Sequence, residues 1–140
     1  MSIEDLSVEA LAHLIKDVFL PVVNIAADLD RDRQLALATL QELGSGHPTI
    51  AQHERILSLQ IGRAVMTHYV RLREHYVQHQ SEIGALTSIR GGELVNALSV
   101  CPERGNADLL YQDPELVRQF VLGCQRQLTS MSARFRELTY

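Results

Sequence analysis

The chain has 140 residues, 46% of them hydrophobic and 21% charged. This composition suits one hydrophobic core and excludes an intrinsically disordered chain. Its formal net charge of −4 disfavours a protein whose main task is to bind nucleic acid. The chain has no Trp, three Phe and four Tyr, and no segment alternates apolar and polar residues as an exposed strand would. We therefore expect one all-α domain spanning residues 1–140.

The first predicted helix begins at Ser2 or Ser7, since either side chain can cap the free N–H groups of an opening turn. Pro21 lacks a backbone donor and clashes with the turn before it, so the helix should kink or restart there. We favour a restart, with Pro21 in the first turn of a second helix. The apolar stripe of this region comprises Leu11, Ile15, Val18, Val22, Ile25 and Leu29.

The second helix is expected to end at the glycine- and proline-containing segment 44–48. Thr49 then offers a capping pattern for a third helix, running from about Ile50 to a point between His79 and Gly84. Apolar residues lie on most sides of this third segment. That pattern predicts a long central helix contacted by several neighbours.

A short segment from Glu93 to Val100 precedes the last helix, whose start is marked by Asp113, Pro114 and Glu115. Asp113 is the expected cap, with Pro114 in the first position. The apolar positions then follow a heptad pattern, which favours packing inside a bundle, with a dimer interface as the alternative. The expected fold is a bundle of four or five helices with a long central helix. The heptad positions are Val117, Val121, Cys124, Leu128, Met131, Phe135 and Leu138.

Histidine spacing suggests a metal site. His75 and His79 are four residues apart and project from one helix face, and Glu82 follows within a turn. His68 is a more distant candidate. The alternative, which we favour, is that these imidazoles cover the edge of an apolar face and form hydrogen bonds there. We accordingly expect no cofactor.

The sequence offers few residue patterns typical of a catalytic site. Cys101 could be reactive, with Arg104 near it in sequence, but no base is placed beside it. Cys124 lies in the heptad pattern and should be a buried, inert thiol. The sequence contains no nucleophile elbow, phosphate-binding glycine loop or HExxH motif. We expect a protein that is not an enzyme.

A DNA-binding regulator is one alternative function. Residues 49–80 carry more basic than acidic side chains, and a helix-turn-helix could lie within 49–74. Its turn would be near Gly62. Arg63, Arg71 and Arg73 would then face the nucleic acid.

The function we favour is non-enzymatic protein–protein interaction, as an adaptor, an assembly or secretion chaperone, or a subunit of a complex, with self-association. The residues predicted to form the interaction surface are Phe120, Leu122, Leu109 and Tyr111. The acidic N-terminal sequence lacks the pattern of a secretory signal, and no unbroken apolar run approaches the ~18 residues that span a bilayer. We expect a cytoplasmic protein.

Overall fold

A computed structural model describes residues 2–42, 60–89, 91–99, 109 and 112–140. Every regular element in these ranges is helical, so the predicted all-α fold is confirmed. The elements are η1 (Ile3–Asp5), α1 (Val8–His13), η2 (Leu14–Phe19), α2 (Leu20–Glu42), α4 (Gln60–Gln78), α5 (Gln80–Leu86), α6 (Gly91–Leu98) and α7 (Glu115–Thr139).

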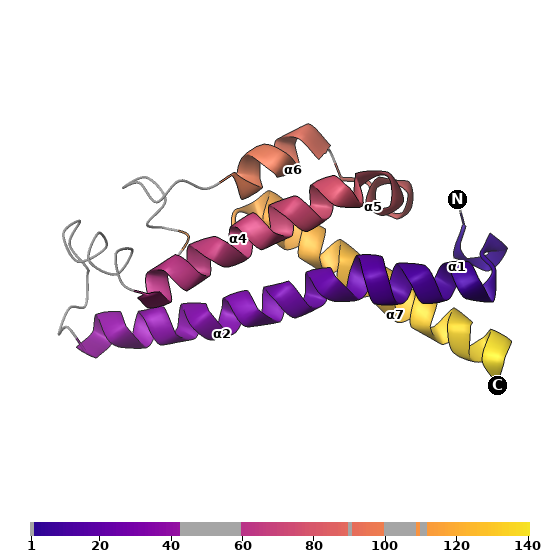
Figure 1. Cartoon of the computed structure of the whole chain (residues 1–140), viewed down its shortest axis with the longest axis horizontal. Coiled ribbons are helices and arrows are strands. Elements are labelled where there is room, and N and C mark those ends of the chain that lie inside the picture. The colour runs from indigo at the N-terminus through magenta and orange to yellow at the C-terminus, as the bar shows by residue number, and fades with distance from the viewer. Residues whose placement is uncertain (1, 43–59, 90, 100–108, 110–111) are drawn as a thin grey trace.

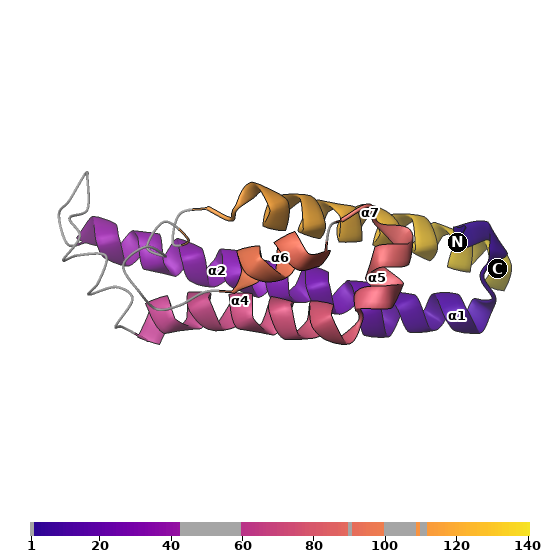
Figure 2. The same cartoon turned by 90° about the horizontal axis from the view of Figure 1, so that it is seen from above.

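The first three helical segments, α1, η2 and α2, join end to end in one long rod (Figure 1). Helix α4 returns along α2, and α7 packs on another side of the rod and reaches α1 (Figure 2). The short α6 rests on both α4 and α7. The two termini therefore lie at the same end of the bundle (Figure 1).

The rod begins at the serine cap that the sequence predicts. Ser7 Oγ accepts a hydrogen bond from the N–H of Ala10 at 3.1 Å. This bond satisfies one of the donors that an opening helical turn leaves free. Of the two candidate serines, Ser7 thus caps α1, while Ser2 precedes the short η1.

The predicted restart at Pro21 is wrong, because the helix continues without a break from Val8 to Glu42. Segment η2 is a π-helix, in which the N–H of Leu20 donates to the carbonyl of Ile15, five residues back. This wider turn makes room for the proline ring, which would strike the carbonyl four residues earlier in a regular α-helix.

The predicted third helix corresponds to α4, which is contacted by α2, α5 and α6, and the rod is a second long helix with several neighbours. Both α4 and α7 pack on the rod, whereas α4 ends at Gln78. His79 leaves helical geometry, with φ −115° and ψ 26°, before α5 begins. The predicted stop at 44–48 and the predicted start at Thr49 lie outside the described residues.

The core lies between the rod and its two partner helices. Tyr76 of α4 stacks on Phe120 of α7 with ring centroids 5.5 Å apart, and both side chains are almost wholly buried. The heptad residues Val117, Cys124 and Met131 are fully buried, while Leu138 at the end of α7 is exposed. The pattern on α7 therefore packs inside the bundle, as we favoured, over all but its last turn.

One segment, Val8–Thr39, is long and apolar enough to cross a bilayer by length and composition, with a best-window mean hydropathy of 1.5. This finding differs from the prediction that no apolar run approaches the length needed to span a bilayer. The core helix of a soluble protein can pass the same test. This segment does supply core side chains, yet only 33% of its most apolar window is buried. The rest of that window is not buried.

Replacing Phe120 by Ala should lower the free energy of unfolding by about 3–5 kcal/mol, because it opens a cavity beside Tyr76. Leu122 is the matched control: it lies two residues along the same helix and is 49% exposed. Leu122→Ala should change stability by less than about 0.5 kcal/mol. Urea denaturation of both variants checks this, and equal losses would contradict the packing described for α7.

Candidate functional site

Arg33 of α2 is a charged side chain that the fold buries. Its Nη2 donates to Asp113 Oδ1 and to the Tyr69 hydroxyl, both at 2.7 Å, and its Nε donates to the carbonyl of Leu109 at 3.3 Å. Tyr69 donates in turn to Asp113. A buried guanidinium needs such partners to offset its lost hydration. We call these residues the Arg33 clamp; it ties α2 to α4 and to the segment before α7.

The clamp explains why Asp113 does not act as the predicted helix cap. Pro114 holds the cap position of α7, and its ring has no group that could make a capping hydrogen bond. The Asp113 carboxylate is bonded to Arg33 and Tyr69 instead. Burial, reinforced by the bond to Asp113, raises the pKa of Tyr69 well above its ordinary value. The tyrosine is therefore a hydrogen-bond donor and not an acid.

A second polar group joins α2 to α4 through His68. The His68 ring donates from Nε2 to Asp32 Oδ2 at 2.6 Å and accepts at Nδ1 from Arg71 Nη1 at 2.8 Å. Arg71 Nη1 also lies 3.4 Å from Asp28 Oδ2. The bond from His68 lowers the pKa of Asp32. An open hollow of about 370 Å³ borders this group, with Arg63 on its rim.

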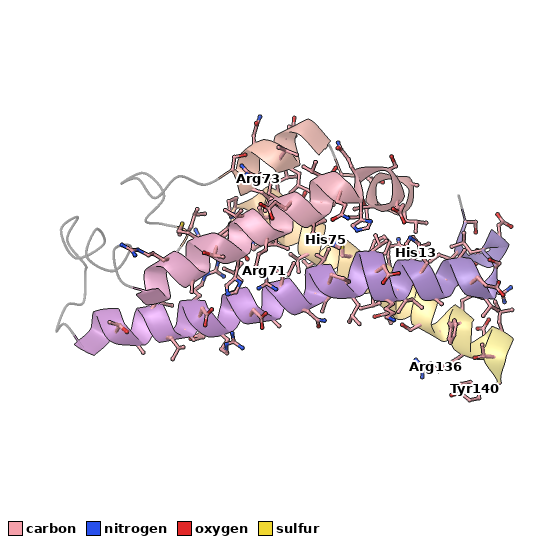
Figure 3. The ribbon with its side chains drawn as sticks, in the orientation of Figure 1. His13, Arg71, Arg73, His75, Arg136 and Tyr140 are labelled. Carbon is pink, nitrogen blue, oxygen red and sulfur yellow. The ribbon has the colours of Figure 1, made fainter. Side chains whose placement is uncertain are left out.

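These contacts weaken the case for a DNA-binding helix. Helix α4 passes through Gly62 without a turn, and Gly62 is buried, so the turn expected at this residue is absent. Arg71 points towards α2 (Figure 3), where it pairs with Asp28. Arg73 instead lies towards α6, 3.5 Å from the Ser99 hydroxyl. Of the three predicted arginines, only Arg63 has no contact partner in the described part of the chain. Residues 49–59 lie outside it.

A histidine–carboxylate cluster lies where α1 and η2 meet α5. His13 places Nδ1 3.1 Å from Asp17 Oδ2 and Nε2 2.8 Å from Glu82 Oε2. The other oxygen of Glu82 is 3.2 Å from His79 Nδ1. With a carboxylate at each ring nitrogen, the charged imidazolium is favoured, and the bond to Glu82 raises the pKa of His13.

His75 takes a different role beside this cluster (Figure 3). Its Nε2–H donates to the carbonyl of Val18 in η2 at 2.7 Å, and its ring lies 4.6 Å from that of His79. Burial lowers the pKa of His75, so the neutral ring is favoured. His75 thus fastens α4 to the widened turn of the rod.

The fold brings His75, His79 and Glu82 together but uses them as hydrogen-bonding groups. The Nε2 atom of His75 is hydrogen-bonded to the Val18 carbonyl, and each carboxylate oxygen of Glu82 is hydrogen-bonded to a histidine. Within the described ranges, no three His, Cys, Asp or Glu side chains are placed to hold a metal ion. His68 lies apart, on Asp32. Spacing along α4 suggested this neighbourhood, but it could not reveal His13 and Asp17, which come from the rod.

The cysteines offer little for nucleophilic chemistry. Cys124 is fully buried, and burial raises its pKa to about 12, as expected for an inert thiol. Cys101 and Arg104 lie outside the described residues.

The structure removes one of the four residues of the predicted interaction surface. Phe120 is fully buried against Tyr76, which corrects its place in the prediction. Leu109 is half-buried and gives its carbonyl to Arg33, while Tyr111 lies outside the described residues. Leu122 alone of the four is shown to be exposed, and its neighbours Arg118 and Arg126 make that face of α7 polar.

Sequence reasoning missed a second exposed surface on α2. Its residues follow one another at helical spacing along α2. All of them are exposed, although the buried stripe of the same helix is also apolar. Two apolar stripes on one helix were the available signal. We call this the outer face of α2; it comprises Leu20, Asn24, Ala27, Arg31, Leu35 and Ala38.

Comparison of the chain with protein-family models, curated proteins and solved structures finds no match.

Removing the carboxylate of the Arg33 clamp should be costly. Asp113→Ala leaves the buried guanidinium with only the solvent-exposed Asp30, 3.4 Å away, as a counter-ion, and we expect the free energy of unfolding to fall by roughly 3 kcal/mol. Glu115→Ala removes an exposed acid two residues away and should cost less than about 1 kcal/mol. Denaturant melts compare the two. Equal, small losses would show that the clamp contributes no stability.

The His13 contacts should make stability depend on pH. A raised pKa in the folded state stabilises the protein below the unfolded pKa, and this contribution is lost as the pH rises through the folded pKa. The stability difference between wild type and His13→Gln should therefore be largest near about pH 6 and shrink towards about pH 8.5. Below about pH 4.5 it should also fall, because Glu82 becomes protonated.

Thermal melts of both proteins across this range measure the difference. Lys16→Gln is the control, since it removes an exposed charge one turn away without touching the Glu82 contact. A difference that does not change with pH would overturn the assignment of the His13 contact as an ion pair.

Proposed function

We propose that this chain is a non-enzymatic protein–protein interaction module that binds through the outer face of α2. The observation that carries the proposal is the exposure of all six residues of that face, four of which are apolar. The two large ones, Leu20 and Leu35, are 37% and 50% exposed. Exposed apolar side chains aligned on one helical face, with polar residues among and beside them, are typical of a surface that meets a partner.

The polar groups support the same proposal. The Arg33 clamp, the His68 group and the histidine–carboxylate cluster each bond side chains of one helix to those of another. Such contacts fix the relative positions of helices. A rigid bundle presents its outer face with little loss of conformational entropy on binding, which favours association.

A protein surface is a better match for this face than a lipid surface. The half-buried Asp28 and the exposed Asp30 flank the stripe, and Arg31 is the single basic residue within it; Asp28 also pairs with Arg71, and Asp30 with Arg33. Anionic membrane surfaces attract basic helices and repel acidic ones. The flanking acids therefore favour a protein partner with apolar side chains and hydrogen-bonding groups.

A photoreactive amino acid placed at Gln34, beside Leu35 on α2, tests the proposal in the native host. We expect one discrete covalent protein adduct, and its loss when Leu20→Gln and Leu35→Gln are added. The matched control carries the same photoreactive group at Gln119, an exposed position on α7. Labelling that yields no protein adduct at position 34, or the same adducts at both positions, would overturn the proposal.

A further inference from the structure

We propose that the partner on the outer face of α2 is a second copy of this chain, with the two α2 helices packed antiparallel. This inference rests on the proposed function and names its partner. It gives the protein an isologous dimer interface, in which the same stripe of residues serves both copies.

The order of residues on the outer face is self-complementary. Leu20 and Leu35 lie equally far from the point midway between Ala27 and Asp28, and so do Asn24 and Arg31. A two-fold axis through that point therefore places Leu20 against the partner's Leu35 at both ends. It places Asn24 against the partner's Arg31 in between. The two large exposed leucines of α2 are thereby both covered.

The charges favour the antiparallel orientation. Arg31 is 65% exposed and lies 3.4 Å from Asp28 in its own helix. In the antiparallel pair its guanidinium faces the amide of the partner's Asn24, with the partner's Asp28 one turn away, and can donate to both. A parallel pair in register would place the two Arg31 side chains against each other, and that like-charge contact is unfavourable.

The centre of the face allows close approach. Ala27 lies next to the axis and has the smallest side chain of the stripe together with Ala38. Helix axes can approach to about 8 Å where the facing residues are small. The stripe is about 27 Å long, which is short for a stable interface, so we expect a weak dimer that forms with increasing concentration.

Disulfide trapping in a Cys101→Ser background tests the orientation, with the buried Cys124 left in place. We expect Ala27→Cys to form a covalent dimer under mild oxidation, because the two Cα atoms meet near the axis within the ~7 Å that a disulfide requires. Ala38→Cys should not, because its two copies would be about 30 Å apart along the helices. A mixture of Asn24→Cys and Arg31→Cys proteins should give the mixed dimer.

Sedimentation velocity on the unmodified chain provides the second readout. The sedimentation coefficient should rise with concentration for wild type and for Leu122→Gln, the matched exposed leucine of α7. It should stay at the monomer value for Leu35→Gln, because this substitution removes the contact between Leu35 and the partner's Leu20 at both ends of the interface. Circular dichroism confirms that both variants keep their helices.

Each contrary result identifies what has failed. Cross-linking at both Ala27→Cys and Ala38→Cys would show a parallel pair and overturn the antiparallel one. A wild-type monomer at all concentrations, with a position-34 adduct of another protein's mass, would overturn self-pairing but leave the proposed function standing. Flotation with anionic vesicles that Leu35→Gln abolishes would show that the face binds lipid, and would overturn both.

Discussion

The widened turn at Leu14–Phe19 lets one helix continue past Pro21, and the rest of the bundle depends on that continuity. Because the rod is unbroken, a single helix offers one face to α4 and another to α7. The turn also presents the Val18 carbonyl to His75, so the same distortion that accommodates the proline provides an attachment point for α4. A break at Pro21 would have separated the two halves of the rod and removed their shared core.

Polar side chains between helices select this arrangement from others that would bury similar apolar area. Apolar packing is non-directional, so it leaves the rotation and register of helices poorly defined. Arg33 requires Tyr69 and Asp113 at hydrogen-bonding distance, and only one register of α2, α4 and the start of α7 provides both. Such contacts add specificity more than stability, because burying the charge is itself costly.

The two faces of α2 connect the fold to the proposed function. The inner face, which carries Val22, Ile25 and Leu29, is buried in the core. On the outer face, Leu20 and Leu35 remain in contact with solvent, although the residues of the inner face already pack α2 against the core. Apolar side chains that the monomer does not use are available for a partner, and the symmetry of their spacing favours an identical one.

The sequence by itself determined the helical class, a serine cap at one of two positions, the inert Cys124 and the burial of the heptad on α7, because these follow from local spacing and hydrophobicity. It also located His75, His79 and Glu82 as neighbours, since they lie close together in the sequence. Only the tertiary structure decided what they contact. His13 reaches Glu82 across 69 positions and Arg33 reaches Asp113 across 80, and no local pattern encodes such pairs. The exposure of Phe120 and Leu20 was likewise decided by which helices pack beside them. The sequence cannot distinguish the two cases, because a buried and an exposed apolar side chain look the same in it.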